Sequence, residues 1–136
     1  MFDHINIFGD YLRIVFIENP GIAFGIRVGP FNVLVAIFSL LATIFITRYL
    51  FIQRNNLNMN TIGLSFILGG AIGNLIDRIL FFLPQSGYKG VIDFIDIGIG
   101  IHRWYIFNVA DSAVTFGIIL YFIHSFLDSK SIKQTN

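Results

Sequence analysis

Carboxylates lie in or beside apolar stretches at three places in this 136-residue sequence. Asp111 lies in FNVADSAVTFGIILYF, Asp93 lies in VIDFID, and Asp77 lies in GNLIDRILFFL. Two carboxylates held close together cannot both ionise easily, so they share one proton. One of them can then activate a water as a base while the other donates to a carbonyl. The sequence therefore predicts hydrolysis by paired aspartates, as in aspartic proteases.

Asp93 and Asp111 are the predicted members of this pair. Asp77 is followed directly by Arg78, whose charge would hold it ionised and unable to share a proton. Asp93 lies in an apolar, β-branched segment, where loss of hydration raises the pKa of a carboxyl. Asp96, three residues later, is the alternative partner on the same segment.

Other chemistries find less support in the sequence. No histidine accompanies Ser112, and all the lysines lie outside the apolar stretches, so a serine hydrolase is not predicted. There is no cysteine, and His4, His102 and His124 are scattered without ligand spacing, so we predict neither a metal site nor a cofactor. Nine Lys and Arg residues nearly balance eight Asp and Glu residues, which argues against nucleic-acid binding.

The composition is that of a membrane protein. Hydrophobic residues make up 55% of the sequence, charged residues make up 12%, and the mean hydropathy is +0.75. Roughly 20 apolar residues in a helix cross the hydrocarbon layer, and residues 31–52, 61–83 and 105–127 are apolar over about that length. We therefore predict one domain of the all-α polytopic membrane class with three transmembrane helices.

The remaining segments predict a small β-rich platform beside these helices. Residues 1–29 read as strand, turn and strand around Asn19-Pro20-Gly21, whose Pro and Gly suit a type II turn. Residues 84–104 form a longer connection that holds a short strand or an interfacial segment. Connectivity puts both segments on one membrane face, opposite the 53–60 loop and the C-terminal tail. The numbers of Lys and Arg on the two faces are equal, so they do not set the orientation.

Polar groups of two predicted helices match in depth. Trp104 is typical of an interfacial anchor, which puts Asp111, seven residues further on, about 10 Å below the surface. In the preceding helix, which ends at Pro84, Arg78 lies at a similar depth and Asn74 one turn deeper. Residues three or four apart share one side of a helix. The spacing therefore predicts a polar pocket open to one leaflet.

Each of these features also has a purely structural interpretation. Asn108 and Asp111 have the spacing of a helix start, and Asp77 with Arg78 can simply neutralise one another. Gly69, Gly70 and Gly73 include a small-xxx-small pattern, Gly69 with Gly73, that predicts helix packing. An intramembrane carboxylate can also belong to a small proton- or ion-conducting subunit, which is the alternative from another functional class.

Four motifs occur in a fixed order along the chain: ENPGIAFG, GGAIGNLIDR, VIDFID and FNVADSAVTFG. Together they closely resemble the lipoprotein signal peptidases (signal peptidase II), which are aspartic peptidases of the bacterial inner membrane. The resemblance implies removal of the signal peptide from a prolipoprotein just before its diacylglyceryl-modified cysteine. It also implies a monomer in membrane lipid, with its site near the outer membrane surface.

The resemblance assigns roles to individual residues. Asp93 and Asp111 match the catalytic dyad, and Asp77 matches a structural acid. The N-terminal platform becomes extracytoplasmic, and the loop before Asp93 becomes part of a mobile lid. Four residues match the family's polar positions around substrate and dyad: Asn19, Asn74, Arg78 and Asn108.

The chain departs from the family pattern in one respect. Family members normally have four membrane helices, the first with its own Asp and Lys motif, whereas this sequence predicts three. Either the start is truncated or that helix is dispensable, and an inactive truncated relative stands as a further alternative.

Overall fold

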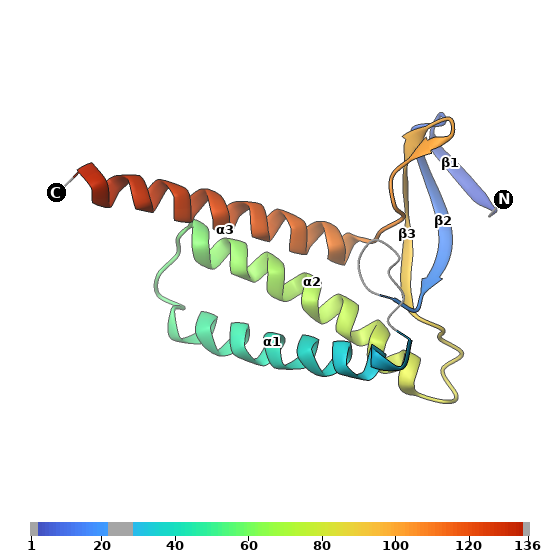
Figure 1. The fold of residues 1–136 in the computed structure, drawn as a ribbon, viewed down its shortest axis with the longest axis horizontal. Coiled ribbons are helices and arrows are strands. Elements are labelled where there is room, and N and C mark those ends of the chain that lie inside the picture. The colour runs from blue at the N-terminus through green and yellow to red at the C-terminus, as the bar shows by residue number, and fades with distance from the viewer. Residues whose placement is uncertain (1–2, 22–28, 135–136) are drawn as a thin grey trace.

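The computed structural model describes residues 3–21 and 29–134. Three helices dominate it: α1 (Asn32–Ile52), α2 (Met59–Phe82) and α3 (Val109–Gln134). Each holds a stretch long and apolar enough to cross a membrane. In Figure 1 they run side by side, with consecutive helices in opposite directions. The three predicted spans are confirmed.

The start of α3 differs from the predicted one. The helix begins at Val109 and not at residue 105, because the preceding residues pair with a strand. The Phe107 N–H donates to the Ile95 carbonyl at 3.1 Å, and the Ile95 N–H donates to the Phe107 carbonyl at 2.7 Å. Asp111 therefore lies in the first turn of α3, and the predicted depth of two helical turns below Trp104 is wrong.

The start of α2 is fixed by a reciprocal cap. Asn58 Oδ1 accepts the Thr61 N–H at 2.9 Å, while Thr61 Oγ1 accepts the Asn58 N–H at 3.0 Å. Such a capping box satisfies two backbone donors that the first turn leaves free. The helix consequently begins at Met59, two residues before the predicted start of the span.

A four-stranded antiparallel sheet lies at one end of the helices (Figure 1). Its strands, in spatial and chain order, are β1 (His4–Phe8), β2 (Leu12–Asn19), β3 (Val91–Ile99) and β4 (His102–Arg103). The predicted N-terminal strand is confirmed as β2, and the apolar connection before α3 does form a strand, β3. The second strand predicted after Asn19 falls within 22–28, outside the described residues.

The sheet is therefore not a platform of the N-terminal segment alone. Two strands come from the N-terminal segment and two from the connection between α2 and α3. Both segments lie at the same end of the helix bundle, and the loop between α1 and α2 lies at the other end (Figure 1). This arrangement confirms that the two segments share one face, and it places β3 beside the start of α3.

Glycines set the distance between α2 and α3. A Cβ atom on Gly70 would lie 2.3 Å from the Ala110 carbonyl oxygen, and one on Gly63 would lie 2.9 Å from the Gly117 carbonyl oxygen. Gly69 has open space around its Cα, so the prediction that it packs against another helix is wrong. Gly73, with Ala110 Cβ 3.1 Å from its ideal Cβ position, does face α3.

Candidate active site

Asp93 lies on β3 with both carboxylate oxygens bonded to amides. The Asn19 Nδ2 donates to its Oδ2 at 2.9 Å, and the Asn108 Nδ2 donates to its Oδ1, also at 2.9 Å. Only 4% of Asp93 is exposed. Around it, Ile14 pairs with Ile95 but Ile17 pairs with Asp93, so β2 uses three residues where β3 uses two. This β-bulge redirects β2 beside the site, as bulges near active sites often do.

Asn19 links the end of β2 to Asp93. Its Oδ1 accepts the Gly21 N–H at 2.9 Å, which is the Asx-turn expected where a strand ends. Its Nδ2 remains directed at the Asp93 carboxylate. Asn19 therefore combines an Asx-turn with a place in the polar site, while the predicted type II turn extends into residues 22–28, outside the described residues.

Asp111 caps α3 and also faces Asn74. Asn108 Oδ1 accepts the Asp111 N–H at 3.0 Å, and Asp111 Oδ2 accepts the Asn108 N–H at 3.2 Å, so the predicted helix-start signature is present. The second carboxylate oxygen, Oδ1, accepts from Asn74 Nδ2 at 2.8 Å. The cap fixes the side-chain rotamer and leaves this carboxylate directed toward α2.

Asn108 and Asn74 connect the two aspartates. Besides its bond to Asp93, the Asn108 Nδ2 donates to Asn74 Oδ1 at 3.1 Å, and Asn108 is 5% exposed. Asp93, Asn108, Asn74 and Asp111 thus form one hydrogen-bonded chain across β3, α2 and α3. In the part of the chain that the structure describes, no hydrogen bond joins the two carboxylates directly. The helix cap directs Asp111 toward Asn108 and Asn74, so these two amides link the two carboxylates.

The surroundings of Asp93 suit it to carry a proton. Burial raises the pKa of the Asp93 carboxyl, and the nearby Asp111 charge raises it further. Hydrogen bonds from Asn19 and Asn108 and the charge of Arg78 oppose this effect without reversing it. The raised pKa predicted from the apolar segment is confirmed, and its main physical cause is loss of hydration.

Asp77 and Arg78 have separate partners. Asp77 Oδ2 accepts the Ile92 N–H at 3.1 Å, while the Arg78 Nη1 donates to the Gly21 carbonyl at 3.1 Å. No close ion pair joins the two side chains within residues 3–21 and 29–134, although the charge of Asp77 acts on Arg78 from nearby. Asp77 instead fastens α2 to the residue beside Asp93.

A cavity of about 720 Å³ opens in front of the two carboxylates. Its polar lining is formed by the side chains of Asn19, Asn74, Arg78, Asp93 and Asp111, together with Ser112 and Thr115 on α3. Its other walls are an aromatic segment, Trp104–Phe107, and an apolar stripe of α3 that reaches Ile119. A largely apolar site with a few convergent polar groups is typical of substrate pockets.

The Trp104–Phe107 wall was not recognised as part of the site from the sequence, where Trp104 was read only as an interfacial anchor. Its position between VIDFID and FNVADS, which supply the two aspartates, was the available signal. The Ile95–Phe107 pairing brings this connecting segment to the cavity. The polar predictions fare better, since the structure brings Asn19, Asn74, Arg78 and Asn108 together around Asp93 and Asp111.

Three membrane-capable helices, with a cavity at the sheet end lined by two carboxylates, are the arrangement of a membrane enzyme. The chain belongs to the signal peptidase II family, because the family profile "Signal peptidase (SPase) II" matches residues 1–127.

Relatives named lipoprotein signal peptidase are similar to this chain over most of its length. A lipoprotein signal peptidase of Borrelia hermsii is 38% identical in an alignment 136 positions long, which covers 95% of this chain and 76% of that protein. One from Moorella thermoacetica is 35% identical over 118 residues, spanning 87% and 71%. A solved bacterial membrane enzyme superposes with a TM-score of 0.77 at 32% identity, covering 96% of this chain and 75% of the other.

Proposed function

We propose that this chain is an aspartic endopeptidase that removes signal peptides from prolipoproteins by cleaving before the diacylglyceryl-modified cysteine. Its family and relatives support the peptidase activity. The observation that carries the proposal is the hydrogen-bonded chain that sets Asp93 and Asp111 on one cavity. No second function is favoured by any feature of the site.

We assign the catalytic dyad to Asp93 and Asp111. Asp93, with its raised pKa, holds the proton and donates it to the scissile carbonyl, while Asp111 takes a proton from the attacking water. Because two coupled carboxyls titrate together, the dyad has two apparent pKa values that belong to the pair.

The surrounding polar residues hold the dyad and the substrate. Asn19, Asn74 and Asn108 orient the carboxylates through their amides. Arg78 uses one nitrogen on the Gly21 carbonyl and lines the cavity, where its remaining donors face the peptide. Asp77 is a structural acid, because it bonds the backbone of β3.

We place the protein in the bacterial inner membrane as a monomer, with the sheet and the cavity on the extracytoplasmic side. The cavity lies at the sheet end of the helices, and its apolar wall runs along α3. A substrate held by its lipid can keep its acyl chains in the adjoining leaflet while the scissile bond reaches the aspartates.

Cleavage is expected to depend on the lipid of the substrate. Contacts remote from the scissile bond supply binding energy that helps the reaction. The purified chain, incubated with diacylglyceryl-modified prolipoprotein in lipid, should release the shortened product, and the unlipidated precursor should be cleaved much more slowly. Product size on a denaturing gel and mass spectrometry give the readout. Equal rates on both precursors would contradict the lipid requirement, and no product from either would contradict the proposed function.

Asp77→Ala is expected to destabilise the protein and slow cleavage. It removes the acceptor for the part-buried Ile92 N–H, and the cost is at most the roughly 1–3 kcal/mol of a fully buried unsatisfied donor. Asp77→Asn keeps an acceptor oxygen and should retain most of the stability. Thermal unfolding in detergent and the cleavage rate of both variants test this. If Asn were as damaging as Ala, the charge of Asp77 would matter more than its hydrogen bond.

A further inference from the structure

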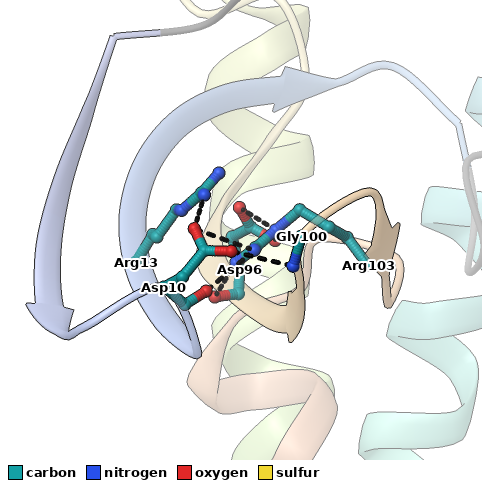
Figure 2. Close-up of polar contacts among 5 residues, drawn as sticks. All are labelled: Asp10, Arg13, Asp96, Gly100 and Arg103. Atoms are coloured by element: carbon teal, nitrogen blue, oxygen red, sulfur yellow. Dashed lines mark hydrogen bonds and ion pairs between the residues drawn. The ribbon is translucent and has the colours of Figure 1, made fainter.

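An ion-pair cluster on the sheet, outside the cavity, joins two hairpins (Figure 2). The Arg103 Nε donates to both Asp96 carboxylate oxygens, at 2.6 and 2.8 Å, and its Nη2 donates to the Asp96 carbonyl at 3.2 Å. Its Nη1 donates to the carbonyl of Asp10 at 2.9 Å. Asp96 is only 5% exposed, and the Arg103 guanidinium forms an ion pair with its carboxylate.

Asp10 carries the same cluster into the turn between β1 and β2. Its side chain accepts the Gly100 N–H at 2.8 Å and pairs with Arg13 (Figure 2). The Gly98 N–H donates to the Tyr11 carbonyl at 2.9 Å nearby. These hydrogen bonds join the turn between β1 and β2 to the turn between β3 and β4.

The Asp96–Arg103 pair lies on the two chain segments that carry the site. Asp96 follows Asp93 by three residues on β3, and Arg103 precedes Asn108 by five residues. Between the pair and the site, the described backbone contacts are at two points: the Trp104 N–H donates to the Ile97 carbonyl at 2.8 Å, and Phe107 pairs with Ile95 and accepts the Phe94 N–H at 3.0 Å. β4 itself has only two residues.

The register between β3 and the segment that leads from Arg103 to Asn108 determines whether the site residues meet. The Asn108 amide reaches Asp93 only if Phe107 lies opposite Ile95, and a slip of one residue turns side chains to the opposite face of a sheet. A two-residue strand specifies register weakly. The Arg103 guanidinium bonds to both the side chain and the backbone carbonyl of Asp96, and these bonds add a constraint on the register.

We infer that Asp96 and Arg103 are positioning residues that hold Asn108 and the Trp104–Phe107 wall in register with Asp93. Neither residue lines the cavity, so they act through the backbone of the hairpin and not by touching the substrate. The inference rests on the proposed function for its kinetic test, and its structural part is measured separately.

Arg103→Gln is expected to lower kcat by between about tenfold and 10²-fold with little change in KM, because small displacements of reacting groups cost rates of this order. Hydrogen exchange should quicken at the Phe107 and Trp104 amides while α1 stays protected. Asp96→Asn combined with Arg103→Gln removes the unpaired buried charge and should recover part of kcat. Arg103→Lys, which keeps the charge and loses the fork, should fall between wild type and Arg103→Gln.

Arg13→Gln is the matched control, because it breaks the neighbouring ion pair with Asp10 and leaves the β3–β4 contacts intact. It should keep wild-type kcat and wild-type exchange at Phe107. Arg103→Gln with unchanged exchange at Phe107 and unchanged kcat would overturn the inference, as would an equal loss in Arg13→Gln. Wild-type protein that cleaves no substrate would instead refute the proposed function, and the exchange data would still decide the register.

Discussion

Asp93→Asn and Asp111→Asn should each abolish cleavage in a protein that remains folded. Asparagine is nearly isosteric with aspartate but neither shares a proton nor accepts one from water. In Asp111→Asn the side-chain oxygen can still accept the Asn108 N–H, so the start of α3 should persist. We expect each rate to fall by about 10⁴-fold or more, the scale of losing one member of a catalytic unit. Product release from lipidated prolipoprotein is the measurement.

The losses should not add. Residues that act as a unit are strongly non-additive, so the double variant should be about as inactive as either single one. The cleavage rate of the wild type should give a bell-shaped pH profile, whose two sides reflect the aspartate pair as a unit. Circular dichroism and thermal unfolding of each variant control for folding. Substantial cleavage by either folded single variant would refute the dyad, and cleavage by Asp93→Asn alone would direct attention to Asp96, although the structure engages that residue with Arg103.

The number and order of the helices could be predicted from the sequence because hydropathy over about 20 residues is a local property. The first residue of each helix was harder to predict from the sequence. The start of α3 depends on pairing between Phe107 and Ile95, which are distant in sequence, and no window around Tyr105 contains that information. The start of α2 is set by a cap between Asn58 and Thr61, a local signal that hydropathy does not detect.

The site shows the same division. A carboxylate in apolar surroundings is costly in free energy and is therefore rare unless it has a function. Asp93 and Asp111 could be selected from the sequence for this reason. Their mutual geometry could not be predicted, because it depends on the side-chain amides of Asn74 on α2 and Asn108 just before α3. These two amides bond to one another, and Asn74 bonds to Asp111. Asp77 and Arg78 were expected to pair because they are adjacent in sequence. Their actual partners, Ile92 and Gly21, come from segments that only the tertiary fold brings near.

The glycine pattern correctly predicts packing for Gly70 and Gly73 but not for Gly69. A small-xxx-small spacing identifies residues on one helix face but does not say which face meets the neighbour. In this fold α3 packs on the side of Gly63 and Gly70, which are seven residues apart, and Gly69 faces away. Seven residues make two helical turns, so this spacing fits a continuous helix contact as well as the shorter one did.

Gly70→Ala is therefore expected to cause the second large loss. Its Cβ would lie 2.3 Å from the Ala110 carbonyl oxygen and 2.6 Å from Val114 Cγ2, and a backbone oxygen cannot move aside without moving α3. Overpacking of this kind costs roughly 1–3 kcal/mol. Because Gly70 lies one turn from Asn74 and Ala110 adjoins Asp111, separation of the helices would also draw that amide from its carboxylate. We expect lower thermal stability together with nearly complete loss of cleavage.

Gly69→Ala provides the matched control, since the same methyl group is added one residue away, where nothing lies within 4 Å. Alanine also has a higher helix propensity than glycine, by about 1 kcal/mol in soluble helices. This variant should be at least as stable as wild type and cleave at the wild-type rate. Thermal unfolding and cleavage measured side by side for the two variants distinguish a packing effect from a general intolerance of α2 to substitution. Equal behaviour of Gly69→Ala and Gly70→Ala, whether both active or both inactive, would show that α2 does not meet α3 through Gly70.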